Sequence, residues 1–306
     1  MSANLLSVRN LTIEYGSGRK RQRAVDNVSF EIQRGETLAL VGESGSGKTT
    51  IGRAIVRLVK VKSGKILYRG SRINGRIGRK RARELTKKIQ MIFQDPMSSL
   101  NERAKVEYIV SEGMLNIRNY RSDSERLFKV HQALSEVGLL PEFADRFPHE
   151  FSGGQRQRIG IARALVMEPE LIIADEPISA LDVSIRAQVL NLLDRLKRER
   201  NLTYLFIAHD LAVVRQIADR VAVIHQGQLV ELAPTEVLFR SPLHPYTRAL
   251  LSAIPLPDPR RERKRQLLTY KPVEDRRDRK PPKWVEVTPG HFILATARQL
   301  REFRPK

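Results

Sequence analysis

The 306-residue chain contains no cysteine. This absence excludes disulfide bonds and thiolate metal sites, and it is compatible with a reducing cytosol. Long apolar runs are also missing, because no stretch approaches the roughly 20 residues that a membrane helix requires. Residues 1–10 lack the charged start and long apolar stretch of a secretory signal. We therefore expect a soluble or membrane-peripheral protein, with enough apolar residues, 41%, to build a core.

Acidic residues are scarce relative to basic ones. The chain has 34 Asp and Glu against 55 Lys and Arg, which gives a net charge of +21. Such a balance invites a nucleic-acid partner. The basic residues are spread over several segments, however, and no zinc pattern, helix-turn-helix signal or aromatic-basic platform accompanies them. A solvated basic surface is the favoured interpretation, and attraction to anionic lipid on a cytoplasmic leaflet is an intermediate one.

A glycine-rich segment at residues 42–49, GESGSGKT, matches the P-loop pattern. In this pattern a glycine turn lets consecutive backbone N–H groups surround nucleotide phosphates. The run Thr37 to Val41 predicts a buried strand entering the loop, and Thr49 to Val59 predicts a helix leaving it, so the phosphates would meet a helix N-terminus. The pattern predicts ATP binding, with Lys48 on the β- and γ-phosphates and the Thr49 hydroxyl on Mg²⁺.

Two acidic residues follow an apolar run at residues 171–174. The run predicts a buried parallel strand, whose carboxyl end faces the ligand crevice of an open α/β sheet. Asp175 would complete the magnesium site. Glu176 is placed to take a proton from the attacking water. The pair alone is common, and other segments are needed to support this interpretation.

A second glycine turn, FSGGQ at residues 151–155, opens a basic helix and forms a further anion-binding helix start. At this segment the sequence resembles the ATP-binding cassette (ABC) family, whose signature sequence it matches except that Phe151 occupies the usual leucine position. The resemblance extends over roughly the first 250 residues. It implies that two cassettes clamp two ATP molecules head to tail, with the signature of one subunit closing over the γ-phosphate held by the other.

The resemblance also implies roles for individual residues. It places Tyr15 against adenine, Gln94 at the Q-loop glutamine that senses the γ-phosphate and couples to membrane subunits, and His209 at the switch histidine. The implied catalytic residues are Glu176, His209 and Gln94, and the implied magnesium ligands are Thr49, Gln94 and Asp175. The ATP contacts would be Tyr15, Gly42, Glu43, Ser44, Gly45, Ser46, Gly47, Lys48, Thr49 and Thr50. The signature is Ser152, Gly153, Gly154 and Gln155, and the D-loop that crosses to the partner subunit is Ser179, Ala180, Leu181 and Asp182.

The predicted fold is α/β: a P-loop NTPase cassette with a RecA-like core, an antiparallel β layer and an inserted helical subdomain. Strands at residues 5–13 and 28–32 would form the β layer, and a mostly helical insertion would span about residues 95–163, with one helix that starts at Ser122 and stops at Gly138. Val221 to His225 and Gln228 to Leu232 would be the last strands. We expect an ATPase domain over residues 1–254 and a basic, Pro-rich tail over 255–306, largely irregular from Pro255 to Lys283.

Two stretches, at residues 149–158 and 241–251, look like the oligopeptide and dipeptide importer ATPases. The second, SPLHPYTRALL, is the more diagnostic. Relatives often carry a cysteine after a Pro-Gly-His stretch in the tail. This chain has Pro289-Gly290-His291 without a cysteine, so thiol chemistry of that kind is excluded.

The resemblance implies an ATP-hydrolysing subunit that energises import of peptides or related solutes, with ATP and Mg²⁺ as cofactors. Expected partners are two integral membrane permeases, a second ABC ATPase that is a different chain in most such importers, and, indirectly, an extracytoplasmic solute-binding protein. No specific nucleic acid is expected, and the expected location is the cytoplasmic face of the cell membrane. The alternative is a soluble ABC ATPase acting on nucleic acid or ribosomes. A purely binding or structural role is disfavoured because Glu176 and His209 are both present.

Overall fold

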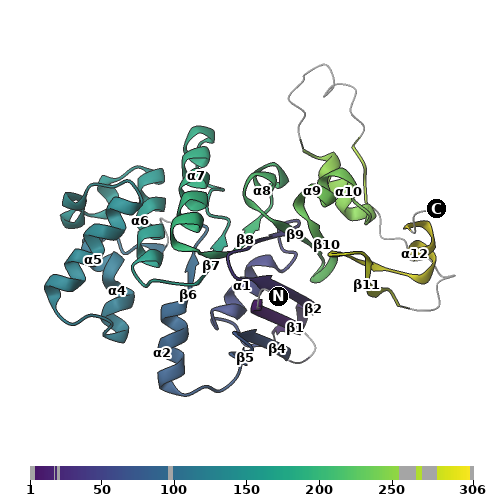
Figure 1. The fold of residues 1–306 in the computed structure, drawn as a ribbon, viewed down its shortest axis with the longest axis horizontal. Helices are drawn as coiled ribbons and strands as arrows, with labels where there is room; N and C mark the ends of the chain where they lie inside the picture. The colour runs from purple at the N-terminus through teal and green to yellow at the C-terminus, as the bar shows by residue number, and fades with distance from the viewer. Residues whose placement is uncertain are drawn as a thin grey trace.

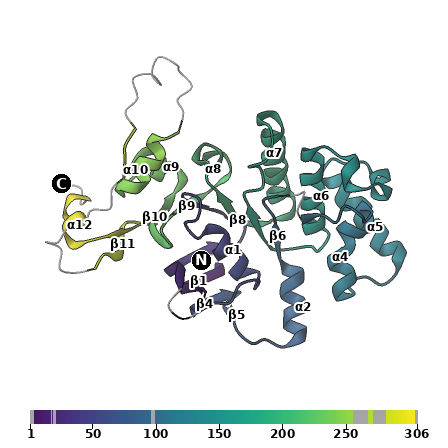
Figure 2. The ribbon, with the colours of Figure 1, turned by 180° about the vertical axis from the view of Figure 1, so that it is seen from behind.

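The computed structural model describes residues 4–16, 18, 21–95, 99–254, 267–270 and 281–303. Two β-sheets occupy the middle of the molecule, with helices α4, α5 and α6 at one end and a C-terminal hairpin at the other (Figure 1). The reverse view shows the same arrangement (Figure 2). The molecule is therefore an α/β protein, as the sequence predicts.

The N-terminal layer is a four-stranded antiparallel sheet with the order β2-β1-β4-β5. It confirms the two strands expected at residues 5–13 and 28–32, although both are longer than predicted. Its strands are β1 (Asn4–Tyr15), β2 (Gln22–Gln33), β4 (Ser63–Tyr68) and β5 (Ser71–Arg72).

The central sheet has eight strands in the order β11-β12-β10-β9-β3-β8-β7-β6. Five neighbouring strands run parallel to one another: β6, β7, β8, β3 and β9. Strands β10, β12 and β11 continue the sheet beyond β9, and each pairs antiparallel with its neighbours. Its strands are β3 (Thr37–Val41), β6 (Ile89–Ile92), β7 (Leu171–Asp175), β8 (Thr203–Ala208), β9 (Arg220–His225), β10 (Gln228–Pro234), β11 (Lys283–Thr288) and β12 (His291–Ala295).

Alternating side chains on the parallel strands build two hydrophobic cores. Leu38 and Leu40 of β3 pack in the core that includes the N-terminal layer, whereas Ala39 and Val41 pack in the core shared with the helical end. Both faces are buried, because successive residues of a strand point to opposite sides of the sheet. Because both faces are buried, these strands are continuous apolar runs in the sequence.

Helices cover the sheet and connect its strands. Helix α1 is shorter than the predicted Thr49 to Val59, because Arg57 has a left-handed backbone with a φ of 68° that no helix continues through. Among the described residues, no helix is both long and apolar enough to cross a bilayer. These helices are α1 (Lys48–Ile55), α2 (Arg79–Lys88), α7 (Val183–Arg200), α8 (Leu211–Ile217), α9 (Thr235–Arg240), α10 (Pro245–Ser252) and α12 (Ala297–Phe303).

The predicted helical insertion is confirmed by α4 (Val106–Ile117), α5 (Asp123–Glu136) and α6 (Gly153–Leu165). Helix α5 begins where the sequence predicts, since the Ser122 hydroxyl accepts a hydrogen bond from the Glu125 N–H at 3.2 Å. It ends before Gly138, whose φ of 73° suits glycine.

The expectation that residues 228–232 form the last strand is wrong. Strands β11 and β12 follow, and β12 pairs with β10 through Glu231 and Leu232. The charged, Pro-rich composition of the tail hid this short hairpin, which turns at Gly290 with a φ of 74°. The expected irregular stretch falls mainly on residues 255–266 and 271–280, which lie outside the described residues. The domain division at residue 254 stays a prediction.

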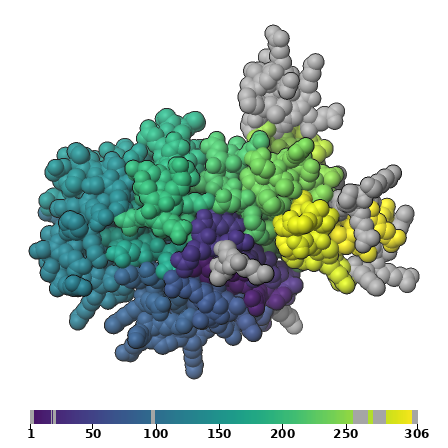
Figure 3. Space-filling view, in the orientation of Figure 1, coloured from purple at the N-terminus to yellow at the C-terminus, as the bar shows by residue number. Residues whose placement is uncertain are grey.

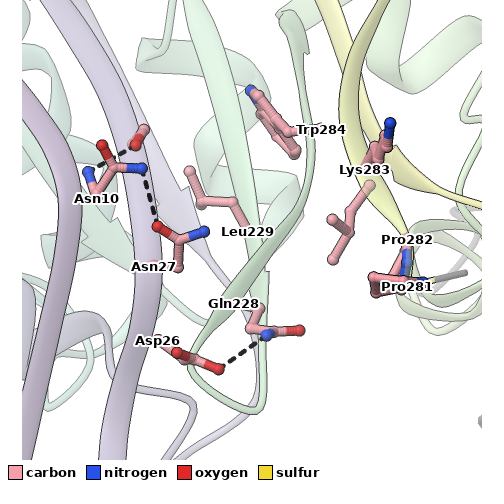
Figure 4. A pocket seen from close by; sticks show the side chains of 11 residues that line it. Asn10, Asp26, Asn27, Gln228, Leu229, Pro281, Pro282, Lys283 and Trp284 are labelled. Atoms are coloured by element: carbon pink, nitrogen blue, oxygen red, sulfur yellow. Dashed lines mark hydrogen bonds between the residues drawn. The ribbon is translucent and has the colours of Figure 1, made fainter.

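The C-terminal hairpin lies beside the N-terminal layer, as the yellow and purple atoms of Figure 3 show. A pocket of about 420 Å³ separates them, lined by Asn10, Asp26, Asn27, Gln228 and Trp284 among others (Figure 4). Its amides and carboxylate pair with one another: Asn10 donates to Asn27 at 2.9 Å and Gln228 to Asp26 at 3.0 Å. The hairpin thus extends the central sheet toward the layer that precedes the P-loop.

Candidate active site

The parallel strands bring the predicted catalytic segments to one edge of the central sheet. The P-loop follows β3, Asp175 ends β7, and His209 follows β8. Gln94 lies just beyond the end of β6. Because β6, β7, β8 and β3 are neighbours and parallel, their carboxyl ends lie together. Segments separated by more than a hundred residues therefore meet in one place.

Two P-loop glycines are required by close backbone contacts. A Cβ on Gly42 would lie 2.1 Å from the carbonyl oxygen of Ile224, and one on Gly47 would lie 2.5 Å from that of Ala24. Gly47 also has a φ of 104°, which favours glycine, and it precedes α1 without a side-chain cap. The first N–H groups of α1 are consequently left for a phosphate group.

Lys48 and Ser46 point into this loop. Nζ of Lys48 donates to the carbonyl oxygens of Gly42 and Glu43, each at 2.8 Å. Burial lowers the pKa of Lys48, while Glu176, Asp175 and Glu43 oppose that shift. The Ser46 hydroxyl is buried and has no partner among the described residues. An ammonium group and an unpaired hydroxyl inside a loop of backbone N–H groups fit a phosphate ligand.

Thr49 and Asp175 form the candidate magnesium site. The Thr49 hydroxyl donates to Oδ1 of Asp175 at 2.8 Å. Burial raises the pKa of Asp175, and the Thr49 hydrogen bond opposes this. The described residues hold no cluster of three or more His, Cys, Asp or Glu suited to a metal. One hydroxyl and one carboxylate nevertheless fit Mg²⁺, which takes few protein ligands and completes its shell with phosphate and water.

Glu176 lies between the two other predicted catalytic residues. Its Oε2 accepts a hydrogen bond from Nε2 of Gln94 at 3.0 Å and lies 3.1 Å from Nδ1 of His209. A carboxylate only accepts, so Nδ1 carries a proton in this arrangement. Glu176 has a left-handed backbone, with a φ of 45°, and its N–H donates to the carbonyl of Ile207 at 3.0 Å. The carboxylate is thereby held over the end of β8.

A cavity of about 400 Å³ brings together most of these groups, although Asp175 does not line it. Its lining comes from the P-loop, Gln94, Glu176, His209 and Ala24 of β2. Tyr15 is 44% exposed, and its hydroxyl lies 3.4 Å from that of Thr50, the residue after the P-loop octet. The exposed ring is available for stacking on a base at this position.

The signature segment lies in a different place. Ser152 caps α6, because its hydroxyl accepts from the Gln155 N–H while Oε1 of Gln155 accepts from the Ser152 N–H at 3.0 Å. A Cβ on Gly154 would lie 2.5 Å from Cγ2 of Ile185, whereas Gly153 faces open space. Ser152, Gly154 and Gln155 line a separate hollow of about 350 Å³ that shares no residue with the cavity at the P-loop.

The D-loop begins three residues after Glu176. Ser179 donates through its N–H and its hydroxyl to the Glu176 carbonyl, at 3.2 and 3.1 Å. Leu181 is buried, whereas Ala180 and Asp182 are exposed. The loop therefore links the candidate base to the start of α7 and leaves an exposed face.

Sequence reasoning missed one contact to the P-loop. The Tyr246 hydroxyl accepts a hydrogen bond from the Glu43 N–H at 3.1 Å, across 203 residues. It also missed Glu231, a fully buried carboxylate that accepts from the N–H groups of Leu243 and His244. The stretch SPLHPYT, which turn chemistry alone does not account for, was the available signal.

Comparisons with known proteins agree with this geometry. The ABC transporter family model matches residues 25–179. The model for the oligopeptide/dipeptide transporter C-terminal region matches residues 230–279. The second match covers most of β10 and all of α9 and α10, where the contacts of Glu231 and Tyr246 lie.

Similar chains are oligopeptide transport ATP-binding proteins. The chain is 58% identical to OppF of Streptococcus pyogenes serotype M1, over 99% of both chains. It is 52% identical to OppF of Bacillus subtilis strain 168, over 99% of this chain and 100% of that one.

Solved structures show the same fold. A dimeric post-hydrolysis state of an ATP-binding cassette bound to ADP and Pi has a TM-score of 0.68 and 29% identity, and the match covers 75% of this chain and 98% of that one. For cbiO1 from Clostridium perfringens, part of an ABC transporter complex, the TM-score is 0.69 at 30% identity, over 78% and 92%. The chain belongs to the ABC transporter ATPases, in the group of the oligopeptide transport ATP-binding proteins.

Proposed function

We propose that residues 42–50 bind the phosphates of ATP, with Lys48 on the β- and γ-phosphates and Tyr15 stacked on the adenine ring. Burial of Lys48 and the unpaired hydroxyl of Ser46 support this assignment. On binding, Nζ of Lys48 exchanges its two bonds to loop carbonyls for bonds to phosphate oxygens. These carbonyl contacts hold the ammonium group in the loop until then.

We further propose that Thr49 and Asp175, with Gln94, hold Mg²⁺. The ion would supply charge neutralisation of the transferring phosphoryl group. Glu176 takes a proton from the attacking water, since its carboxylate lies in the cavity next to the P-loop. Gln94 and His209 orient that carboxylate through their contacts with Oε2 and respond to the γ-phosphate. The convergence of these three side chains is the observation that carries the proposal.

The signature residues act on the ATP held by a second cassette. Their separation from the P-loop cavity within one chain supports a role across an interface. The free space beside Gly153 and the N–H groups at the start of α6 suit the close approach of a γ-phosphate. The exposed part of the D-loop meets the same partner. ATP then holds two cassettes together, and hydrolysis releases them.

The chain energises the import of oligopeptides or related solutes. Its partners are two membrane permeases, a second ABC ATPase and, indirectly, an extracytoplasmic solute-binding protein, and its place is the cytoplasmic face of the cell membrane. The printed names of its relatives, oligopeptide transport ATP-binding proteins, support this role. They do not favour the alternative of a soluble ATPase on nucleic acid or ribosomes.

A purification experiment tests the proposal. Tagged Glu176→Gln is purified with ATP from detergent-solubilised membranes, and the copurifying proteins are identified by mass spectrometry. Two polytopic membrane proteins and a second cassette are expected. Glu199→Gln, an exposed substitution on α7, is the matched control and should recover less of the ATP-held assembly. Recovery in the soluble fraction only, with nucleic acid or ribosomes attached, would contradict the transport role.

A further inference from the structure

The start of α10 lies directly behind the P-loop. Tyr246, the second residue of α10, is 1% exposed, and its hydroxyl oxygen accepts the Glu43 N–H at 3.1 Å. A phenol is protonated at neutral pH, and burial raises the pKa of Tyr246 further. A buried side chain from the C-terminal third of the chain thus holds the second residue of the P-loop.

The same part of the structure supports the P-loop at two further points. The Gly227 N–H, in the turn between β9 and β10, donates to the Ser46 carbonyl at 3.1 Å. Gly42 lies against the carbonyl of Ile224 in β9. His225, between these two contacts, has its ring 4.1 Å from that of Tyr246, measured between centroids. The β9–β10 turn and α10 therefore form one continuous support behind the loop.

Glu231 fixes the position of α10. Its carboxylate is fully buried and accepts the N–H groups of Leu243 and His244 at 2.8 and 3.0 Å. It also accepts a hydrogen bond from Nε2 of His291, in the C-terminal hairpin, at 2.7 Å. Nδ1 of His244 in turn accepts the Tyr246 N–H at 3.1 Å. The hairpin, β10 and the chain entering α10 are joined through one carboxylate.

We propose that Tyr246 is a positioning residue of the nucleotide site, and that the Glu231 cluster of Leu243, His244 and His291 sets its position. The inference rests on the proposed role of residues 42–50 in phosphate binding. By fixing the Glu43 N–H, the Tyr246 hydroxyl holds the P-loop in the conformation that receives phosphates before ATP arrives. Such preorganisation lowers the entropic cost of binding and therefore acts on ATP affinity. Tyr246 touches no reacting atom, so the chemical step is spared.

Tyr246→Phe tests this directly, because it removes the hydroxyl and leaves the ring against His225. The Kd and KM for ATP should rise about three- to tenfold, the factor that one net hydrogen bond contributes. The kcat at saturating ATP should stay within about twofold of the wild-type value. Tyr204→Phe is the matched control, since Tyr204 is equally buried and its hydroxyl has no partner among the described residues. Unchanged ATP affinity in Tyr246→Phe, or an equal change in both variants, would overturn the proposal.

A second variant tests the connection to the C-terminal segment. Glu231→Gln should also raise the KM for ATP, and its effect should be less than additive with that of Tyr246→Phe if both act through α10. Fully additive effects would overturn this connection. Lys48→Ala separates the proposed role of Tyr246 from the proposed binding of phosphate by residues 42–50. If Lys48→Ala loses ATP affinity and Tyr246→Phe does not, only the role of Tyr246 fails; if Lys48→Ala keeps full affinity, the phosphate-binding assignment fails.

Discussion

His291 donates a hydrogen bond through Nε2 to Oε1 of Glu231 at 2.7 Å, although 60 residues separate them. Both side chains are almost completely buried. The pair joins the C-terminal hairpin to β10 at the point where Glu231 also holds the chain entering α10. A residue in the basic tail is therefore part of the core that supports the P-loop.

We expect His291→Ala to lower the free energy of unfolding by about 2–3 kcal/mol, because it removes one hydrogen bond from a buried carboxylate. Urea unfolding at neutral pH measures the effect. His131→Ala, on the exposed surface of α5, is the control and should stay within about 0.5 kcal/mol of wild type. Equal stabilities of the two variants would contradict a structural role for this pair.

Glu176→Gln should keep ATP binding and lose turnover, because the amide keeps the size of the side chain but cannot take a proton. We expect the hydrolysis rate to fall about 10²- to 10⁴-fold, the usual contribution of a general base. Phosphate release measures the rate, and size-exclusion chromatography with ATP should show accumulated dimer. Hydrolysis at the wild-type rate would remove Glu176 from the mechanism. Glu199→Gln should hydrolyse normally.

Lys48→Ala should weaken ATP binding itself. The ammonium group is buried among the P-loop carbonyls and is attracted by the carboxylates of Asp175 and Glu176. Its loss removes the charge that would balance the phosphates. We expect at least a tenfold rise in the Kd for ATP, the factor that corresponds to about 1.4 kcal/mol. A fluorescent ATP analogue measures the change. Lys60→Ala, at an exposed position beyond α1, is the control.

The stability of the protein should depend on pH through His244. Burial lowers the pKa of this imidazole from 6.5 to about 4, with Glu231 opposing and His225 adding to the shift. The unfolded chain therefore binds a proton at a higher pH than the folded one, and the contribution to stability is present above pH 6.5 and lost as the pH falls toward 4. Between pH 7 and pH 5 the loss from this group is about 2 kcal/mol.

His244→Asn isolates this effect, because asparagine keeps a cap acceptor for α10 and does not titrate. Urea unfolding at pH 7 and pH 5 should show a smaller difference in the variant than in wild type. The same loss in both proteins would mean that other groups carry the pH dependence. His225 is one such group, since burial lowers its pKa as well.

The sequence predicts the parts of the fold that depend on local pattern. The strand at Thr37–Val41 has the predicted bounds, and the Ser122 cap begins α5 as expected. The candidate catalytic side chains meet because each of them lies at or just beyond the carboxyl end of a parallel strand. The short apolar runs of the sequence predict those strands. Their roles, which the resemblance implied residue by residue, stay predictions until variants are measured.

Long-range contacts of single polar atoms were beyond the sequence. Nothing in the local pattern of Tyr246 indicates that its hydroxyl meets Glu43, or that Glu231 is buried between two backbone N–H groups and His291. The hairpin at residues 283–295 was missed for a related reason. Its two short strands pair with each other and, through β12, with β10, which is a long-range contact. The charged and Pro-rich residues around them are typical of irregular structure.

The left-handed backbone at Glu176 is unfavourable for folding, whereas the proposed reaction needs the side chain at this position. A side chain in that conformation costs free energy, on the order of 1 kcal/mol, that glycine would not incur. Glycine at this bend would relieve that cost, and it would also remove the carboxylate that contacts Gln94 and His209. Under the proposed role of Glu176, the backbone strain at this bend is therefore a cost that the fold carries for the reaction.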